Sequence, residues 1–352
     1  MNLSICFTVY NQSKLLEEQI SKIIHTSDED FEIVLSDDCS TEDIYGVVEK
    51  LNDRRIKYYK TPNNIGHDLN ILHGLNHCTK DYVMILRTRD SIKVENIKSI
   101  YNIIQNNHNV GYFYFSADYE GRIRLRLRDR VFSCGKETMI AHLSLPEHPS
   151  GNIYNRKYLN SELYESYIKR HFDDRFGFMV DKLIRCDLST KFDMLTSSEI
   201  GWVYADTLNA NDVAVNNAGN GKNIYAPEYC YPRYKCIMEF CRNEIGNEFK
   251  NQYILGTMKS YYKFIVGKAP MILRDSRYFT HYNSKYSNVS RISILKEMNK
   301  ITDEVLSDET KLLKKKAMFT KNWLNIYCLI VYPIKEVLRK IYIITKFGGK
   351  EK

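Results

Sequence analysis

Short apolar runs alternate with amphipathic segments along the first 90 residues of the chain. Four runs predict strands, the first of them a buried one: 3–9 (LSICFTV), 31–35 (FEIVL), 56–59 (IKYY) and 82–86 (YVMIL). Three helices are expected between them, over 13–25, 42–51 and 70–77. The first of these carries Leu16, Ile20 and Ile23 at helical spacing. Strands that alternate with helices predict right-handed βαβ units and a mostly parallel sheet.

Polar side chains collect where the predicted strands end. Tyr10 and Asn11 follow the first strand, Asp37 and Asp38 follow the second, and Arg87–Asp90 follows the fourth. The carboxyl ends of parallel strands meet at one edge of the sheet, where ligands of such folds bind. Because loops are commonly polar, each group alone indicates little, and the combination of three predicts one site.

Composition and charge narrow the class of protein. The chain has 352 residues, of which 43% are hydrophobic, and only 7 Pro, so we expect a compact body with helical extensions. The net charge is +8, with basic runs at 122–130 and 311–316. Such runs attract nucleic acid, anionic lipid or an anionic substrate, or they form a solvated surface.

Cysteine usage and the chain termini bear on location. The 9 Cys are scattered without a CxxC pair or a zinc spacing, which fits a reducing cytoplasm. The N-terminus lacks the basic and apolar regions of a signal peptide. The longest uncharged apolar stretch, 323–333, is shorter than the roughly 20 residues of a spanning helix. We therefore expect a cytoplasmic protein.

The first 90 residues resemble the family 2 glycosyltransferases of the capsule and surface-polysaccharide type, which have the GT-A fold. Four strings carry the resemblance in the family's order: SICFTVYNQSKLLEEQI, FEIVLSDDCSTED, NNIGHDLNILHGL and KDYVMIL. The most specific is DDCSTED after an apolar strand. The resemblance implies an α/β GT-A domain over 1–235, with a nucleotide-sugar half (1–92) and an acceptor half (93–235). A helical extension (236–310) and a basic amphipathic tail (311–352) would follow.

The resemblance also implies a nucleotide site. Seven residues are expected to form it: Thr8, Tyr10, Asp37, Asp38, Asn64, Gly66 and His67. Asp38 would accept a hydrogen bond from the base, since a uracil-like ring presents an N–H donor. Asp37 would support the ribose or the turn. Gly66 would permit close backbone approach, and His67 would reach a phosphate or lie exposed in its loop.

After the fourth strand the sequence departs from the family. Members usually carry an Asp-x-Asp cluster that holds Mg²⁺ or Mn²⁺ against the two phosphates. Here the chain reads LRTRDS over 86–91, and Asp90 is the one carboxylate. Three readings are open. Asp90 holds the metal with phosphates and water, or Arg87 or Arg89 pairs directly with the diphosphate, or the site is inactive.

The acceptor half contributes two further segments. The run 148–154 (HPSGNIY) resembles a segment that borders the acceptor, which implies acceptor-side roles for His148, Ser150 and Gly151. The segment 176–188 resembles the helix that carries the family's Glu-Asp pair, with Val180 in place of Glu and Asp181 matching Asp.

In inverting members that Asp is the general base that deprotonates the acceptor hydroxyl. Asp181 is therefore the expected base, and Asp173, Asp174 and Glu147 are the alternatives. By a looser resemblance, Arg233 would close over the diphosphate.

Basic and aromatic residues mix in the last 42 residues, as at Trp323 and Tyr327. A basic amphipathic segment with Trp and Tyr suits an anionic membrane surface. The alternatives are a helix packed on the core or a dimer interface.

Together these features predict an inverting glycosyltransferase, peripheral on the inner face of a bacterial cell membrane. It would move a sugar from a nucleoside-diphosphate donor, UDP in preference to GDP or dTDP, to a saccharide or polyprenyl-linked glycan. The alternative is a non-catalytic nucleotide-sugar or glycan-binding protein with a degenerate site. No nucleic-acid module is recognisable, so no nucleic-acid partner is expected.

Overall fold

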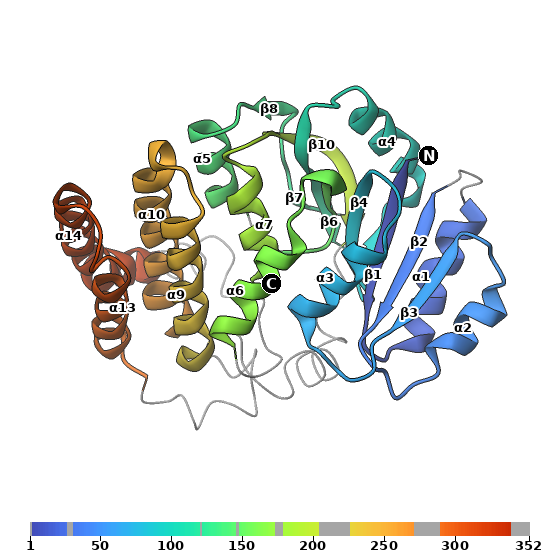
Figure 1. The fold of residues 1–352 in the computed structure, drawn as a ribbon, viewed down its shortest axis with the longest axis horizontal. Helices are drawn as coiled ribbons and strands as arrows, with labels where there is room; N and C mark the ends of the chain where they lie inside the picture. The colour runs from blue at the N-terminus through green and yellow to red at the C-terminus, as the bar shows by residue number, and fades with distance from the viewer. Residues whose placement is uncertain are drawn as a thin grey trace. The chain divides into compact units, whose positions relative to one another are not determined.

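A computed structural model describes residues 2–26, 31–119, 122–145, 148–172, 179–203, 226–270 and 289–338. The chain forms two compact units, residues 1–222 and 223–352. The first contains a large sheet flanked by helices, and the second is helical (Figure 1).

The first four strands and their helices form a parallel half-sheet. In chain order the elements are β1 (Leu3–Val9), α1 (Ser13–Thr26), β2 (Glu32–Asp37), α2 (Ile44–Leu51), β3 (Ile56–Lys60), α3 (His67–His77) and β4 (Tyr82–Arg87). The strands lie in the order β3-β2-β1-β4, and all three pairings are parallel. The βαβ pattern predicted from the alternating runs is confirmed here.

The second half of the sheet is mixed. Its elements are β5 (Ser91–Ile92), η1 (Val94–Asn96), α4 (Ile97–Gln105), β6 (Val110–Tyr119), β7 (Arg122–Leu125), β8 (Arg130–Phe132), α5 (Lys136–Ser144), β9 (Asn152–Asn155), η2 (Arg156–Tyr158), α6 (Ser161–His171), α7 (Val180–Leu188) and β10 (Asp193–Val203). The order continues β4-β9-β6-β10-β5. Short β9 runs antiparallel between β4 and β6, whereas β6 and β10 pair in parallel.

Side-chain alternation along the strands divides the core into two layers. Ile5 and Phe7 of β1 belong to the apolar cluster that includes residues of α1, α2 and α4. Cys6, between them, points to the opposite face, where α3 lies. A Cβ at Gly74 of α3 would come within 2.5 Å of the Cys6 sulfur, so glycine lets this helix lie close against β1.

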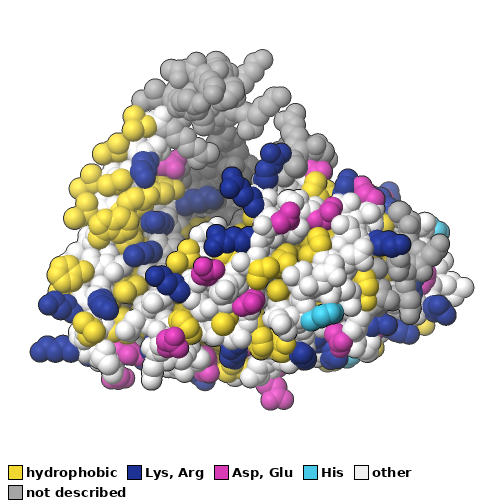
Figure 2. Space-filling view, turned by 90° about the horizontal axis from the view of Figure 1, so that it is seen from above, with side chains coloured by type: hydrophobic (Ala, Val, Ile, Leu, Met, Phe, Trp, Pro, Cys, Tyr) yellow, Lys and Arg dark blue, Asp and Glu magenta, His cyan; other side chains and the backbone are white. Residues whose placement is uncertain are grey.

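The second unit consists of helices. They are α9 (Pro227–Asn243), α10 (Asn247–Tyr261), the π-helical η3 (Tyr262–Lys268), α13 (Arg291–Val305), α14 (Lys311–Ile326) and the π-helical η4 (Tyr327–Val331), which continues as helix to residue 338. On the left of Figure 2, where this unit lies, apolar side chains gather with Lys and Arg among them. The predicted helical C-terminal region is confirmed. No helix in the described part of the chain is long and apolar enough to cross a membrane.

Candidate functional site

The turn after β2 is built around Asp37. This carboxylate is fully buried. It accepts hydrogen bonds from the Ser40 backbone N–H at 2.8 Å and from the Tyr58 hydroxyl at 2.7 Å. Burial, together with Asp37, raises the pKa of the Tyr58 phenol well above its usual value. These contacts are those of a residue that supports the turn, one of the two roles expected for it.

Asp38 holds the loop that follows β3. Its two oxygens accept the backbone N–H groups of Ile65, at 2.6 Å, and Gly66, at 2.9 Å. Burial raises the pKa of the Asp38 carboxyl, and the two backbone hydrogen bonds work against this rise. Gly66 has a φ of +86°, which favours glycine. Asp38 thereby fixes the loop in which Asn64 lies half-buried; its contact with a nucleotide base stays a prediction.

The loops after β1, β2 and β4 are tied together. The Asn11 side-chain oxygen accepts from the backbone N–H of Thr41 at 2.9 Å, across the two loops. The Thr88 hydroxyl donates to the carbonyl of Thr8 at 3.1 Å. Tyr10, between these contacts in sequence, is half-buried. Three strand ends predicted to converge therefore do so through direct hydrogen bonds.

His67 opens α3 and contacts its neighbour Asp68, with Nδ1 and Oδ1 3.0 Å apart. Asp68 also accepts the backbone N–H groups of Met179, at 2.8 Å, and Val180, at 3.2 Å. These N–H groups open α7, which has no capping side chain of its own. A buried carboxylate at a helix N-terminus is stabilising there. The start of α3, which follows the loop held by Asp38, is thus joined to the helix that carries Asp181.

The end of β4 forms a compact charged cluster. Asp90 is fully buried and accepts from Arg87 Nε at 2.8 Å and from the Ser150 hydroxyl at 2.5 Å. His148 Nε2 lies 3.7 Å from the same carboxylate and also contacts the Arg87 guanidinium. Burial opposes ionisation, but Arg87, His148 and the two hydrogen bonds together hold the pKa of Asp90 well below its usual value.

This cluster does not fit a divalent cation. The Asp90 carboxylate is already neutralised by Arg87, and a second guanidinium, Arg89, lies close enough to feel both charges. Mg²⁺ and Mn²⁺ need oxygen ligands free of such cations. Within the described residues, no three His, Cys, Asp or Glu side chains are grouped as a metal site. We therefore derive no step through a metal.

Arg89 differs from Arg87. It is half-buried, and within the described residues it makes no hydrogen bond and no ion pair. Burial, with the nearby charge of Arg87, lowers the pKa of Arg89 to about 10. The group stays protonated at neutral pH at a desolvation cost that a bound anion would offset. Of the two arginines considered for the diphosphate, Arg89 is the one not engaged by its neighbours.

The segment 148–152 packs into this cluster. The His148 ring stacks on Trp202, with 4.4 Å between ring centroids. Gly151 has a φ of +79°, and a Cβ there would come within 2.0 Å of the Trp202 ring. Glycine is therefore required at this close approach. The expected acceptor-side residues His148, Ser150 and Gly151 thus contact the end of β4 and the neighbouring Trp202.

Asp181 lies at the start of α7, and several hydrogen-bond donors surround its carboxylate. Asn152 Nδ2 donates to Oδ1 at 2.6 Å, and the Tyr154 hydroxyl donates to the same atom at 2.5 Å. Oδ2 pairs with the buried Arg185 at 2.5 Å, one turn along the helix. These partners favour the ionised carboxylate and fix its orientation. The Asp181 side chain keeps 11% of its exposure, so it is not sealed from solvent.

The segment 150–152 links the two charged centres through one hydrogen bond to each. Ser150 binds Asp90, and Asn152, two residues later, binds Asp181. Sequence reasoning missed Asn152 and Arg185. Both left a signal: Asn152 lies within the HPSGN run, and Arg185 stands four residues after Asp181 on a predicted helix, where opposite charges meet.

Some predicted residues cannot be joined to this site. Arg233 lies in α9 of the second unit, buried, with its guanidinium 5.8 Å from the Phe264 ring. Its role toward a diphosphate stays a prediction. The alternative bases Asp173, Asp174 and Glu147 lie outside the described residues.

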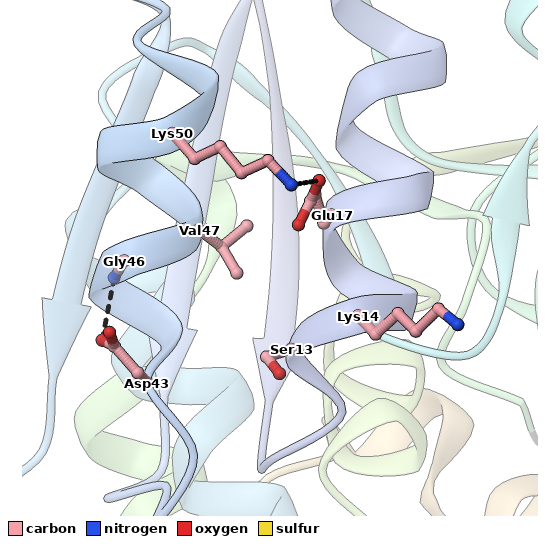
Figure 3. A pocket seen from close by; sticks show the side chains of 7 residues that line it. All are labelled: Ser13, Lys14, Glu17, Asp43, Gly46, Val47 and Lys50. Atoms are coloured by element: carbon pink, nitrogen blue, oxygen red, sulfur yellow. Dashed lines mark hydrogen bonds and ion pairs between the residues drawn. The ribbon is translucent and has the colours of Figure 1, made fainter.

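A shallow groove elsewhere on the first unit is a poor candidate. It lies between α1 and α2 and is lined by Ser13, Lys14, Glu17, Asp43, Gly46, Val47 and Lys50 (Figure 3). The Lys50–Glu17 ion pair, 2.5 Å long, crosses it. None of its side chains belongs to the clusters at the strand ends.

Comparison with known proteins shows that part of the chain is similar to glycosyltransferases. Residues 4–166 match the model of glycosyl transferase family 2. An uncharacterized glycosyltransferase of Haemophilus influenzae is 30% identical over 108 residues, 30% of this chain and 43% of the relative. The GalNAc(5)-diNAcBac-PP-undecaprenol beta-1,3-glucosyltransferase of Campylobacter jejuni is 34% identical over 93 residues, 26% of this chain and 30% of the relative. The chain therefore spans less than half the length of these two relatives.

A solved structure with a similar fold is S. aureus TarS 1–349 in complex with UDP-GlcNAc. It is 14% identical, with a TM-score of 0.56 over 88% of this chain and 93% of that one. The predicted GT-A fold is confirmed by this likeness. The family match and both relatives support a family 2 glycosyltransferase. The matched range contains the four strand ends and residues 148–152, whereas Asp181 lies beyond it.

Proposed function

We propose that the protein is an inverting glycosyltransferase that moves a sugar from a UDP-sugar to a saccharide or lipid-linked acceptor. The observation that carries the proposal is the segment 150–152, which hydrogen-bonds to Asp90 through Ser150 and to Asp181 through Asn152. It joins an arginine cluster suited to a diphosphate with an oriented, ionised carboxylate. The family match supports the same reaction class.

At the donor end, the diphosphate would be held by Arg89. A guanidinium fork matches phosphate oxygens and needs no metal to bridge it. Arg87 would act indirectly, because its own charge is neutralised by Asp90. Arg89 would lie beside the departing nucleoside diphosphate, whose developing negative charge it would stabilise.

At the acceptor end, Asp181 would act as the general base. The acceptor hydroxyl oxygen would form a bond to the anomeric carbon while the bond from that carbon to the diphosphate oxygen breaks. The hydroxyl proton would pass to Asp181. One displacement inverts the configuration, so no covalent enzyme intermediate is needed.

The family resemblance and one relative support a proposal for the acceptor and the setting. That relative's name includes an undecaprenol-linked glycan. We propose a saccharide or polyprenyl-linked acceptor, used in the synthesis of a bacterial surface polysaccharide such as a capsule. The reaction would then take place on the cytoplasmic side of the cell membrane.

The test is nucleotide-sugar binding with and without metal. Isothermal titration with UDP and UDP-GlcNAc, compared with GDP and dTDP sugars, should show binding that persists in EDTA. Arg89→Ala should weaken it by about 1.5–3 kcal/mol, the range for a charged hydrogen bond. The matched control is Arg128→Ala, since Arg128 is an exposed arginine of the first unit.

Three outcomes would count against parts of the proposal. Loss of binding in EDTA would restore a metal to the site. Equal weakening by Arg89→Ala and Arg128→Ala would remove Arg89 from the diphosphate. Binding without transfer to any saccharide or lipid-linked acceptor would favour the non-catalytic alternative, toward which the replaced Asp-x-Asp cluster points.

A further inference from the structure

The helix over 311–338, made of α14, η4 and the turns that follow, is apolar on two opposite faces. The inner face carries Leu313, Ala317, Leu324 and Cys328, all buried, where α14 packs on α10. The outer face carries Phe319, Trp323, Ile326 and Ile330, at spacings of four, three and four residues. Phe319, Trp323 and Ile330 are 63%, 49% and 55% exposed. The unit's own packing explains the inner face only.

The outer face is a continuous feature. Leu312 precedes it and Ile334 extends it, and both are exposed. Apolar side chains seen in Figure 2 gather on this part of the molecule. Single exposed apolar residues are ordinary, whereas a contiguous stripe along one helix marks an interaction site.

Positive charge surrounds the stripe. Lysines occupy 311, 314, 315, 316, 321 and 335, and Glu336 is the one acidic residue between 311 and 338. Lys321 pairs with Asp303, but the other five lysines are exposed. Lys263, from the neighbouring η3, adds an ammonium 5.7 Å from the Trp323 ring. The stripe is therefore bounded by cations near both ends.

Aromatic rings lie at the edge between the apolar and the charged regions. Trp323 stacks on Tyr327, with 5.1 Å between ring centroids. The ammonium groups of Lys263 and Lys335 lie 5.3 and 5.4 Å from the Tyr327 ring. Trp and Tyr with neighbouring Lys are favoured at the headgroup level of a bilayer, where an apolar body meets polar headgroups.

We propose that the outer face of the helix 311–338 docks flat on an anionic membrane surface, with Phe319, Trp323 and Ile330 inserted below the headgroups. The lysines would pair with anionic headgroups, and the inner face would stay packed on α10. This assigns the predicted membrane attachment to one face of one described helix. It rests on the proposed function only for the identity of the membrane, and it needs no contact between the two units.

A second copy of the chain is the other partner that could cover the apolar stripe. Charge argues against it. Two such faces brought together would place two sets of exposed lysines side by side, with Glu336 as the one acidic residue of the segment to offset them. Anionic headgroups offset the same lysines directly.

The test uses the full-length protein and vesicles. Trp323 is a suitable reporter because the chain has 2 Trp and the other, Trp202, is buried. Vesicles of phosphatidylglycerol and phosphatidylethanolamine should shift the emission to the blue, and quenchers placed in the lipid acyl chains should reduce it. Phosphatidylcholine vesicles should bind at least about tenfold more weakly, and high salt should release part of the protein.

Two variants and two controls separate the contributions. F319Q with I330Q should weaken vesicle binding at least about tenfold, as should Lys314, Lys315 and Lys316 changed together to Gln. The apolar control is I292Q, at an exposed Ile of α13, and the charge control is R126Q with R128Q. Both controls should bind as the parent protein does.

The results that overturn the proposal are concrete. Equal binding to phosphatidylcholine would remove the charge argument. A dimer in lipid-free buffer that F319Q with I330Q converts to monomer, without vesicle binding by the parent, would assign the face to a second copy. None of these measurements involves a nucleotide, and the titration with UDP involves no lipid, so the two proposals fail separately.

Discussion

The two ends of the candidate site hold their carboxylates in different ways. At the proposed nucleotide end, Asp38 is held by two backbone N–H groups, and among the described residues no cation pairs with it. At the transfer end, Asp90 and Asp181 are each paired with an arginine, Arg87 and Arg185. The first arrangement leaves a buried negative charge that shapes a loop. The second neutralises each carboxylate inside the protein.

The difference explains how the departure from the family pattern can be tolerated. Asp90 would not repel a bound anion, because Arg87 neutralises its charge. That leaves Arg89 as the surplus positive charge of the cluster, where the family places a metal. The nucleotide end proposed here keeps the DDCSTED string and its carboxylates, so the change is confined to the cluster at the end of β4.

The largest expected effect concerns Asp181. Asp181→Asn should reduce transfer by about two or more orders of magnitude while donor affinity stays unchanged, since a base is lost and no donor contact. Initial rates and UDP titration would measure the two quantities.

Asp187→Asn is the matched control. Asp187 lies on the same helix, is buried, and also pairs with a cation four residues on, Lys191. If both variants lose activity equally, the effect belongs to the helix. If Asp181→Asn keeps full activity, the base is another residue, with Asp173, Asp174 and Glu147 as the remaining candidates.

The next effect is on stability and depends on pH. Asp90→Asn leaves Arg87 without its carboxylate partner, which should cost about 3 kcal/mol of unfolding free energy at pH 7. Because folding depresses the pKa of Asp90, its contribution is present above its unfolded pKa of about 4 and is lost as the pH falls toward the folded value. Denaturant titrations should therefore show the gap between parent and variant shrinking below about pH 4.

Asp303→Asn breaks the exposed pair with Lys321 and should cost less than about 1 kcal/mol. A pH-independent gap for Asp90→Asn would mean that the Arg87–Asp90 pair is not the origin of the loss.

At the nucleotide end, Asp38→Ala should weaken UDP binding by about 1–3 kcal/mol. It removes the acceptor of two backbone N–H groups and the expected acceptor of a base N–H. Calorimetry on the folded variant would measure the change. Unchanged affinity would show that neither the loop held by Asp38 nor its carboxylate contacts the nucleotide.

The smallest expected effect tests the connection that Asp68 makes between α3 and the start of α7. Asp68→Ala removes the cap of α7 and should cost about 1–2 kcal/mol of stability. It should also lower kcat by about tenfold, because Asp181 would be less well placed. Asp43→Ala is a matched control, since Asp43 caps α2 through the Gly46 N–H at 2.8 Å. Asp43→Ala should lose similar stability without a loss of kcat. If the two variants have the same kcat, the cap of α7 does not contribute to catalysis.

Local pattern was sufficient for the first half of the fold. The apolar runs predicted β1, β2 and β4 because parallel strands that are buried on both faces read as continuous apolar segments. The run IKYY also predicted β3, which lies at the edge of the sheet and is only partly buried. The second half of the fold was harder to predict from the sequence. β9 has four residues and lies antiparallel between β4 and β6, and a strand this short has no periodicity to detect. Its place depends on partners from distant parts of the chain.

The sequence by itself determined the βαβ order, the strand ends where polar residues meet, and the presence of arginines where the family has carboxylates. Those features depend on residue type and short-range spacing. Tertiary structure decided which charges pair. Asp90 is neutralised by Arg87 while Arg89 keeps no partner among the described residues, although Arg89 is the nearer of the two arginines in sequence. It also decided which face of the helix 311–338 is covered, because burial depends on neighbours that spacing along the chain does not specify.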